Sequence, residues 1–564
     1  MIEHDLLIVG GGLAGLRAAV ETCASLDVGL LSRVHPLRSH SLAAQGGINA
    51  ALGNHPEARD DSPERHAFDT VKGSDYLADQ DAARLMCEGA TEIVCEMEHW
   101  GTPFSRFDDG RIAQRPFGGA GFSRTCFAAD RTGLVLLHAL YERAVSLGLR
   151  VYEEWLVTKL VVLEGQAIGV IALHYLTGRL EAFAARAVLF ATGGYGRVYA
   201  RSTNALINTG SGIALAYAAG VGIKDLEFVQ FHPTGLATTG ILITEGARGE
   251  GGHLRNRDGE RFMERYAPKA MELAPRDIVA RSMTTEILEG RGFDDAYLHL
   301  DLRHLGARKI RARLPGIREL AIDFEGVDPI EEPIPVVPAQ HYSMGGIDVD
   351  VTGASEMAGF YAAGECACVS VHGANRLGGN SLLEAIVFGR EAGRTAGVYA
   401  REAAAPGGAP AALHDARATE IERIRSLLTK RGTRPYPLRD RLGRIMSDRV
   451  GIFRNENDLR AAVEEIRRIR GEAAELCVCG ASPACNQELI DVLDLTGMID
   501  LGEIIAAGAL RRTESRGSHA RTDFPRRDDA RWLRHTVAHR GPDGPLLTEK
   551  AVTITDYEPR ERTY

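Results

Sequence analysis

The stretch DLLIVGGGLAGLRAAV, residues 5–20, decides the fold of the amino-terminal region. The apolar run at its start predicts a strand, and the apolar periodicity at its end predicts a helix. Between them lies a glycine-rich turn, the arrangement in which a diphosphate sits at a helix N-terminus. Its glycines include Gly10, Gly12 and Gly15. On its own, the pattern predicts only that a dinucleotide binds here.

The end of the next apolar run bears on which dinucleotide binds. Residues 28–31 lead into Ser32 and Arg33, where many dinucleotide folds carry an acidic residue that binds the ribose. The missing carboxylate disfavours an ordinary NAD site.

Two later segments, residues 187–194 and 359–365, repeat the pattern of an apolar run that ends in a glycine-rich turn. Such turns so far apart predict one sheet assembled from separated segments, with residues 235–341 inserted between them. Within the insertion we expect a helix around residues 278–288. The prolines of residues 332–338 exclude a helix there and predict an extended segment.

The composition changes after residue 389. Residues 403–412 are rich in Ala, Pro and Gly and predict a linker. Helical periodicity then recurs at residues 421–428, 459–469 and 489–510, which predicts a helical bundle. Residues 516–564 are polar, and we expect them to wrap around the molecule rather than to form a core.

Composition and charge exclude several classes of protein. The chain has 564 residues, of which 45% are hydrophobic and 25% charged, as in soluble proteins of two or more domains. No run of apolar residues is long enough to span a membrane, and the amino terminus leaves no room for a signal peptide. We therefore expect the protein to stay in the compartment where it is made. A net charge of -10 argues against a nucleic-acid partner.

The nine cysteines are scattered, as expected of reduced thiols in a cytoplasm. Cys477, Cys479 and Cys485 form one cluster that could be read as metal ligands. Because the usual spacing of a fourth ligand is missing, we favour packing or an irregular loop there.

A second informative stretch is RSHSLAAQGG, residues 38–47. Its small side chains cannot build a core, whereas its glycines allow the backbone to approach a flat ligand closely. We expect His40 to lie against the edge of a cofactor. The alternative is a loop histidine bonded to a neighbouring carbonyl group.

Charged and imidazole side chains recur in loops rich in glycine or proline, the composition of a binding loop on a rigid scaffold. Each of them alone is more often an ordinary surface residue, but together they could converge on a dianion. These loops are residues 231–235, 244–252, 275–277, 340–346 and 372–382.

With these residues the sequence resembles the flavoprotein subunit of the succinate dehydrogenase and quinol:fumarate reductase family, nearly from end to end. The blocks that carry the resemblance are residues 38–47, 69–75, 230–234, 260–268, 372–382 and 512–516 and the terminal Arg562, Thr563 and Tyr564. The resemblance implies an α/β fold with a Rossmann-like FAD-binding domain in two parts, residues 1–234 and 346–402. It also implies an inserted α+β capping domain at 235–345, a helical bundle domain at 412–515 and a C-terminal extension at 516–564.

The resemblance also implies roles for single residues. His40 stands where the family attaches FAD covalently, and Arg276 stands at the position of the proton-transfer residue, fed by a relay of Glu245 and Arg248. The positions that match substrate carboxylate contacts are His232, Thr244, His341 and Arg376. Those that match flavin contacts are Gly10, Gly12, Gly15, Ser32, Gln45, Gly46, Gly47, Glu365, Ser381 and Leu382.

These roles agree with the chemistry that succinate and fumarate require. Both are dianions and need positive donors at each end, and Arg376 can hold a carboxylate through two hydrogen bonds. Succinate must lose a hydride to the flavin and a proton to the protein. Arginine is an unusual base because its pKa lies near 12 or above, so Arg276 must pass the proton on through Glu245 and Arg248.

Three features depart from the family pattern. Ser211 stands where many relatives carry an aspartate near the flavin, and Ser41 replaces a common threonine but keeps the hydroxyl. The loop of residues 118–124 is shorter than in many members, which leaves its substrate contacts open.

The resemblance also implies partners. The chain has no iron–sulfur cysteine pattern, so we expect an iron–sulfur subunit and a membrane anchor with a quinone, at the cytoplasmic face of a prokaryotic membrane. Two alternatives stay open: a soluble relative such as L-aspartate oxidase, and a catalytically silent flavoprotein scaffold for an electron-transfer assembly. His40 and the residues at 562–564 argue against the first, and the complete set of polar site residues argues against the second.

Overall fold

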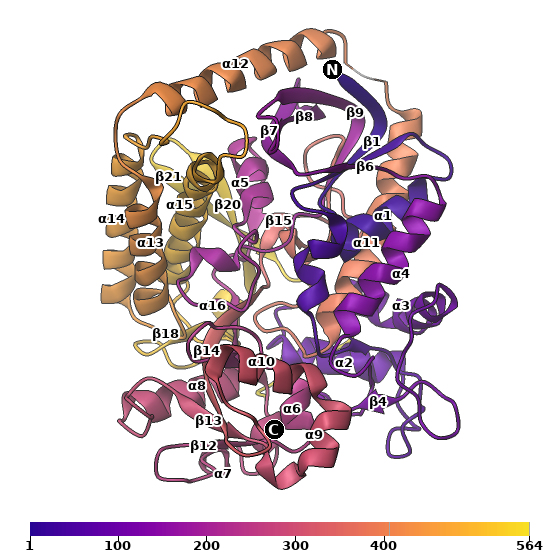
Figure 1. The fold of residues 1–564 in the computed structure, drawn as a ribbon, viewed down its shortest axis with the longest axis vertical. Coiled ribbons are helices and arrows are strands. Elements are labelled where there is room, and N and C mark those ends of the chain that lie inside the picture. Colours follow the sequence, from indigo (N-terminus) through magenta and orange to yellow (C-terminus); the bar gives the residue numbers. More distant parts are fainter. Residues whose placement is uncertain (405, 563–564) are drawn as a thin grey trace.

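The computed structural model describes residues 1–404 and 406–562. Its largest sheet has seven strands in the order β6–β2–β1–β9–β8–β7, with β16 paired to β9 (Figure 1). The parallel strands are β1 (Ile2–Val9), β2 (Val28–Ser32), β6 (Arg150–Glu153), β9 (Leu180–Phe190) and β16 (Phe360–Ala362). The hairpin of β7 (Trp155–Leu163) and β8 (Gln166–His174) continues the sheet in the antiparallel sense. Because β16 joins β9 across about 170 intervening residues, the prediction that separated segments build one sheet is confirmed.

Two helices, α1 (Leu13–Thr22) and α11 (Asn380–Glu402), begin at the carboxyl edge of the parallel strands. Helix α1 follows the glycine turn and packs against α11 and α4 (Thr132–Ser146). Gly10 has φ +119°, and a Cβ there would lie 2.1 Å from the Ala191 carbonyl oxygen. A Cβ on Gly15 would lie 1.9 Å from the Gly10 carbonyl oxygen. Only glycine therefore permits this close meeting of turn, helix and sheet.

Residues 229–343 form a separate sheet in the order β11–β14–β13–β12, so its first strand begins before the predicted insertion. A second hydrophobic cluster, whose buried residues all lie between Leu236 and Val336, packs around it. The strands are β11 (Val229–Leu236), β12 (His253–Arg255), β13 (Leu298–Asp301) and β14 (Ile334–Ser343). The helices are α6 (Glu245–Gly249), α7 (Met263–Tyr266), α8 (Arg276–Leu288), α9 (Ala307–Arg313) and α10 (Pro315–Glu325). Helix α8 and strand β14 confirm the predicted helix and the predicted extended segment.

Four long helices follow. Helices α13 (Pro435–Arg449), α14 (Glu456–Ala473) and α15 (Gln487–Arg511) pack against one another as expected of a bundle. Helix α12 (Ala409–Thr429) instead lies across β7, β8 and β9, along the top of the molecule in Figure 1. It begins within the predicted linker because Pro410 occupies its first turn, where the missing N–H costs nothing.

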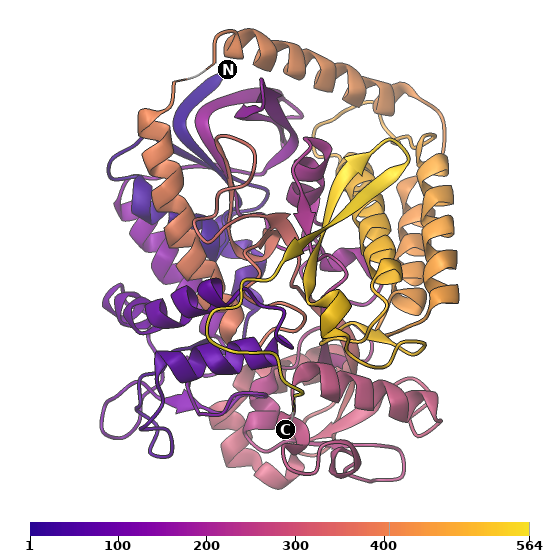
Figure 2. The same ribbon diagram turned by 180° about the vertical axis from the view of Figure 1, so that it is seen from behind.

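The C-terminal segment differs from the expectation that it only wraps. Strands β20 (Arg534–Gly541) and β21 (Gly544–Ala551) form a hairpin that extends a second sheet, in the order β17–β15–β10–β20–β21. The polar composition of this segment did not indicate β20. His535 on this strand is a polar residue that is buried by pairing with Asp225, with Nδ1 2.6 Å from Oδ2. Beyond the hairpin, the Thr553 N–H donates to Asp79 at 2.6 Å, and the chain runs down to the inserted domain, where Arg562 pairs with Asp277 (Figure 2).

Of the terminal match, Thr563 and Tyr564 lie outside the described residues. The remaining strands of the second sheet are β10 (Ile223–Lys224), β15 (Gly346–Asp348) and β17 (Ala367–Cys368). Helices α2 (Pro63–Gly73), α3 (Gln80–His99) and α5 (Ser211–Ala218) complete the longer elements around the main sheet. Within residues 1–404 and 406–562, no helix has both the length and the apolar character needed to cross a bilayer.

Candidate active site

One cavity extends from the glycine turn of the main sheet to the inserted domain. It collects nearly all the predicted site residues, although they come from segments spread over more than 370 positions. The predicted residues that line it are Gly10, Gly12, Ser32, His40, Gln45, Gly46, Gly47, His232, Thr244, Glu245, Arg276, His341, Glu365, Arg376, Ser381 and Leu382. Gly15 and Arg248 do not line it: Gly15 packs inside the turn, and Arg248 lies behind Glu245.

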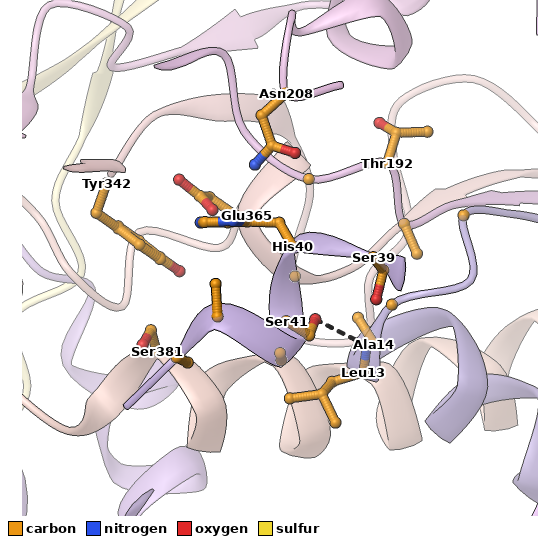
Figure 3. Close-up of a pocket in the computed structure, with 18 of the residues that line it drawn as sticks. Leu13, Ala14, Ser39, His40, Ser41, Thr192, Asn208, Tyr342, Glu365 and Ser381 are labelled. Atoms are coloured by element: carbon orange, nitrogen blue, oxygen red, sulfur yellow. Dashed lines mark hydrogen bonds between the residues drawn. The ribbon is translucent and has the colours of Figure 1, made fainter. Parts of the chain in front are cut away.

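The first end of the cavity is built mainly from backbone. The first turn of α1 faces it, and the Leu13 N–H donates to the Ser41 hydroxyl at 3.3 Å (Figure 3). A helix N-terminus beside close-packed glycines is suited to a diphosphate. Several buried polar atoms around it lack a partner among the described residues, and a polar ligand would satisfy them. They are Ser39 Oγ, Gln45 Oε1, Thr192 Oγ1 and Asn208 Nδ2. These features fit an elongated dinucleotide such as FAD.

His40 lies midway along the cavity in a short 3₁₀ helix, residues His40–Ala43. Its Nδ1 accepts a hydrogen bond from the Ala205 N–H at 3.2 Å, and Nε2 lies 3.3 Å from the Asn204 side-chain nitrogen. Burial, together with the positive charge of Arg197, lowers the pKa of His40 to about 4. The imidazole is therefore neutral at physiological pH, with Nδ1 committed to the backbone.

Two further histidines face each other at the second end. His232 on β11 and His341 on β14 have ring centroids 4.9 Å apart. The Thr234 N–H donates to His232 Nδ1 at 3.2 Å, which leaves Nε2 as the donor nitrogen. Burial and the charge of Arg276 hold the pKa of both histidines well below its usual range. Both rings therefore act as neutral hydrogen-bonding groups.

Arg276 and Glu245 form a buried ion pair beside these rings. Arg276 Nε lies 2.6 Å from Glu245 Oε2, and Arg276 Nη1 donates to Gln230 at 3.0 Å. The second Glu245 oxygen accepts from the Gly118 N–H at 2.6 Å. Arg248 Nη2 lies 3.9 Å from the same Glu245 oxygen, Oε2. Burial opposes ionisation of Glu245, but Arg276 and Arg248 outweigh it and lower the pKa of the carboxyl group.

Arg376 supplies the second cation of this end. It is 2% exposed, and burial lowers its pKa to about 9, so the guanidinium stays charged at neutral pH. Thr244 stands at the N-cap of α6, where its hydroxyl accepts from the Gly246 N–H at 3.1 Å. The second end thus combines two cations, two neutral imidazoles and a threonine around a small space, a lining suited to a small dianion.

Comparison with known proteins agrees with this geometry. Residues 5–382 match the family model described as an FAD binding domain, and residues 439–564 match the one described as the fumarate reductase flavoprotein C-terminus. The fumarate reductase flavoprotein subunit of Mycobacterium tuberculosis is 46% identical over 100% of this chain and 99% of its own. The chain belongs to the succinate dehydrogenase and fumarate reductase flavoprotein family.

Other members of the family are also similar over most of the chain. The succinate dehydrogenase flavoprotein subunit of Coxiella burnetii is 46% identical over 95% of this chain and 94% of its own. A mutant form of E. coli quinol fumarate reductase FrdA has the same architecture, with a TM-score of 0.95 and 38% identity over 100% of this chain and 99% of that one. The FAD-binding α/β fold predicted from the sequence is therefore confirmed.

The departures from the family pattern fall at both ends of the cavity. Ser211 lines it at the start of α5, and Ser41 keeps its hydroxyl bond to Leu13. The short loop of residues 118–124 touches the second end through the Gly118 bond to Glu245. Cys477 is buried, whereas Cys479 and Cys485 are exposed, and the described part of the chain contains no group of metal-binding side chains.

Sequence reasoning missed several lining residues. Tyr342 directly follows His341 within residues 340–346, one of the predicted binding loops, so its position in the sequence could have indicated that it lines the site. Phe117, Thr203 and Glu384 also line the cavity, but they stand in ordinary sequence surroundings that carry no such signal.

Proposed function

We propose that this chain interconverts succinate and fumarate as the flavoprotein subunit of a membrane-bound complex. The observation that carries the proposal is one cavity, with a dinucleotide-shaped backbone site at one end, His40 midway along it, and Arg276, Arg376, His232 and His341 at the other end. A dicarboxylate between the cations would lie next to a flavin placed against His40.

The substrate carboxylates would be held by four side chains. Arg376 and His341 are suited to one part of the dianion, and His232 and Thr244 to another, because each presents an N–H or O–H into the cavity. Burial makes these interactions stronger than they would be in water. Two cations also offset the cost of desolvating a dianion.

Arg276 would transfer the proton. It lines the cavity, and its guanidinium is joined to Glu245 at 2.6 Å and through Glu245 to Arg248 at 3.9 Å. In fumarate reduction Arg276 acts as an acid at the carbon that receives the proton. In succinate oxidation it must be relieved of the proton, and the ionised Glu245 is the acceptor within reach.

FAD supplies the hydride acceptor and donor when bound. His40 would hold it covalently through Nε2, the nitrogen that is not committed to the Ala205 N–H. Because Nδ1 is the acceptor in the neutral ring, Nε2 carries the ring proton and must lose it as the bond to the flavin forms. The other flavin contacts would come from the glycine turn, Ser32, residues 45–47, Glu365, Ser381 and Leu382.

Electrons must reach a second redox centre outside this chain. Its sequence has no iron–sulfur cysteine pattern, so an iron–sulfur subunit would carry them to or from a quinone in a membrane anchor. The name of the E. coli relative, a quinol fumarate reductase, supports this assignment. The complex would face the cytoplasm of a prokaryotic cell.

Dye-linked assays of the purified complex test the proposal. We expect succinate oxidation, fumarate reduction and flavin that stays on the denatured polypeptide, and we expect His40→Ala to release the flavin on denaturation. Oxidation of L-aspartate with flavin lost on denaturation would favour the soluble oxidase class instead. Full flavin loading without either activity would favour the silent scaffold.

A further inference from the structure

Among the described residues, Arg376 is the one cation lining the substrate end without an ionic partner in contact. Its guanidinium makes no hydrogen bond or ion pair with any other described residue, and its Nε is buried and unpartnered. By contrast, Arg276 at the same end is paired with Glu245 at 2.6 Å. A buried cation without compensation is costly, so something else must stabilise the charge of Arg376.

The face of Tyr342 supplies that compensation. The Arg376 Cζ lies 4.2 Å from the centroid of the Tyr342 ring, well within cation–π range. Tyr342 is on β14 and 6% exposed. Its ring points into the cavity from the side that also carries Glu365, opposite Ser41 (Figure 3).

The ring is itself held at its hydroxyl end. The Tyr342 hydroxyl donates to Glu384 Oε2 at 3.1 Å and lies 3.5 Å from His372 Nε2. Glu384 is on α11, the helix that also carries Ser381 and Leu382. The orientation of the Tyr342 ring is therefore fixed: its hydroxyl is bonded to Glu384 on α11, and its face lies against the Arg376 guanidinium.

This arrangement suits carboxylate recognition better than an ion pair would. A carboxylate partner would occupy the N–H groups of Arg376 and compete with the substrate for them. A ring face contacts the guanidinium plane and leaves its edge donors available for two parallel bonds.

We propose that Tyr342 is a positioning residue for substrate binding: its ring, oriented by Glu384, stabilises the Arg376 cation while keeping its donors free for a substrate carboxylate. This rests on the proposed function, in which Arg376 holds one end of a dicarboxylate. It adds a positioning role for a neutral aromatic side chain that acts on the substrate through Arg376.

A graded series at position 342 tests the proposal in the assembled complex with minimal change of volume. Tyr342 is replaced by phenylalanine and by mono-, di- and trifluorophenylalanine, which weaken the ring face stepwise. The probe is malonate, a dicarboxylate without two adjacent carbons to dehydrogenate, measured by calorimetry. We expect Tyr342→Phe to bind within about threefold of the native complex, and affinity to fall by about tenfold across the fluorinated series.

Turnover measurements add a second readout. If Tyr342 acts through Arg376 on binding, KM for succinate should rise along the series while kcat stays nearly constant. Tyr342→Leu removes the face altogether and should weaken malonate binding by about 10- to 30-fold. Tyr217→Leu, which removes a buried tyrosine outside the cavity, is the matched control for lost volume and should bind malonate normally.

The outcomes separate the two proposals. A flat fluorinated series, or Tyr342→Leu that binds malonate as tightly as the native complex does, overturns the role of Tyr342 while leaving the proposed function intact. If the native complex binds neither malonate nor fumarate, the proposed function itself fails. Should Tyr342→Leu lose its flavin, the fluorinated variants still decide the question.

Discussion

The two ends of the cavity are built in different ways. At the dinucleotide end, backbone geometry provides most of the site, through a glycine turn and a helix N-terminus, and a few unpartnered side-chain atoms surround it. At the dicarboxylate end, side chains provide it, and Arg276, Arg376, His232 and His341 come from four separate segments. The first end tolerates almost no added atoms, whereas the second depends on charge and orientation. Substitutions at the first end should therefore reduce flavin content, whereas substitutions at the second end should reduce turnover or dicarboxylate binding.

The largest effect is expected from Gly10→Ala at the dinucleotide end. Alanine at φ +119° is strained, and its Cβ would lie 2.1 Å from the Ala191 carbonyl oxygen, which is backbone and cannot move aside. We expect nearly complete loss of bound flavin, measured as visible flavin absorbance per protein.

Gly110→Ala is the matched control for this prediction. Gly110 also has positive φ, +84°, but no atom lies within 4 Å of the site of its Cβ. It therefore carries the strain without the collision and should retain its flavin. If Gly10→Ala keeps its flavin as well, the close approach at the turn is not what forms the site.

The next largest effect is expected from Arg276→Ala at the dicarboxylate end. This change removes the proton donor but leaves the glycine turn untouched, so flavin content should stay normal. We expect kcat for fumarate reduction to fall by about 10³- to 10⁴-fold. Arg303→Ala, which removes an arginine paired with Asp301 elsewhere in the inserted domain, should leave kcat unchanged. Loss of flavin in Arg276→Ala would show that the two ends are not separable.

A moderate, pH-dependent effect is expected from Glu384, which lies between the two ends. Burial raises its pKa to about 8; Tyr342 and Arg376 oppose this shift, and Glu365 adds to it. Below that pH the group is neutral, and above it the carboxylate repels a bound dianion. Malonate affinity should therefore fall by up to about tenfold per pH unit above about pH 8.

Glu384→Gln keeps an oxygen for the Tyr342 hydroxyl but cannot ionise. Its malonate affinity should fall much less between about pH 7 and about pH 9 than that of the native complex. Glu365 titrates in both proteins, so the difference between the two curves isolates Glu384. Identical curves would mean that Glu384 stays neutral throughout or lies too far from the dianion to act on it.

The contrast between the ends also explains what the sequence could predict. The turn at Gly10 and the strand before it are local, so periodicity and glycine spacing sufficed for them. Tyr342 had only its place beside His341 as a signal, and Glu384 had none, because a glutamate in a helix is an ordinary residue until the fold places it beside Tyr342. Helix α12 shows the same limit: periodicity identified its apolar face but not the sheet that covers it. The β20 strand was hidden because His535 is buried by pairing with Asp225 rather than by being apolar.

The smallest effect is expected at Ser41, beside the first turn of α1 at the dinucleotide end. Its hydroxyl accepts from the Leu13 N–H, one of the N–H groups that open α1 and have no partner within the helix. Ser41→Ala should lower stability by about 1 kcal/mol, the usual cost of losing such an acceptor, whereas Ser41→Thr keeps the hydroxyl and should stay within about 0.5 kcal/mol. Thermal unfolding of the three proteins at matched flavin content measures the difference. Equal stability of Ser41→Ala and the native protein would mean that water serves this N–H as well as the serine does, and that the first turn of α1 is held by the glycine contacts alone.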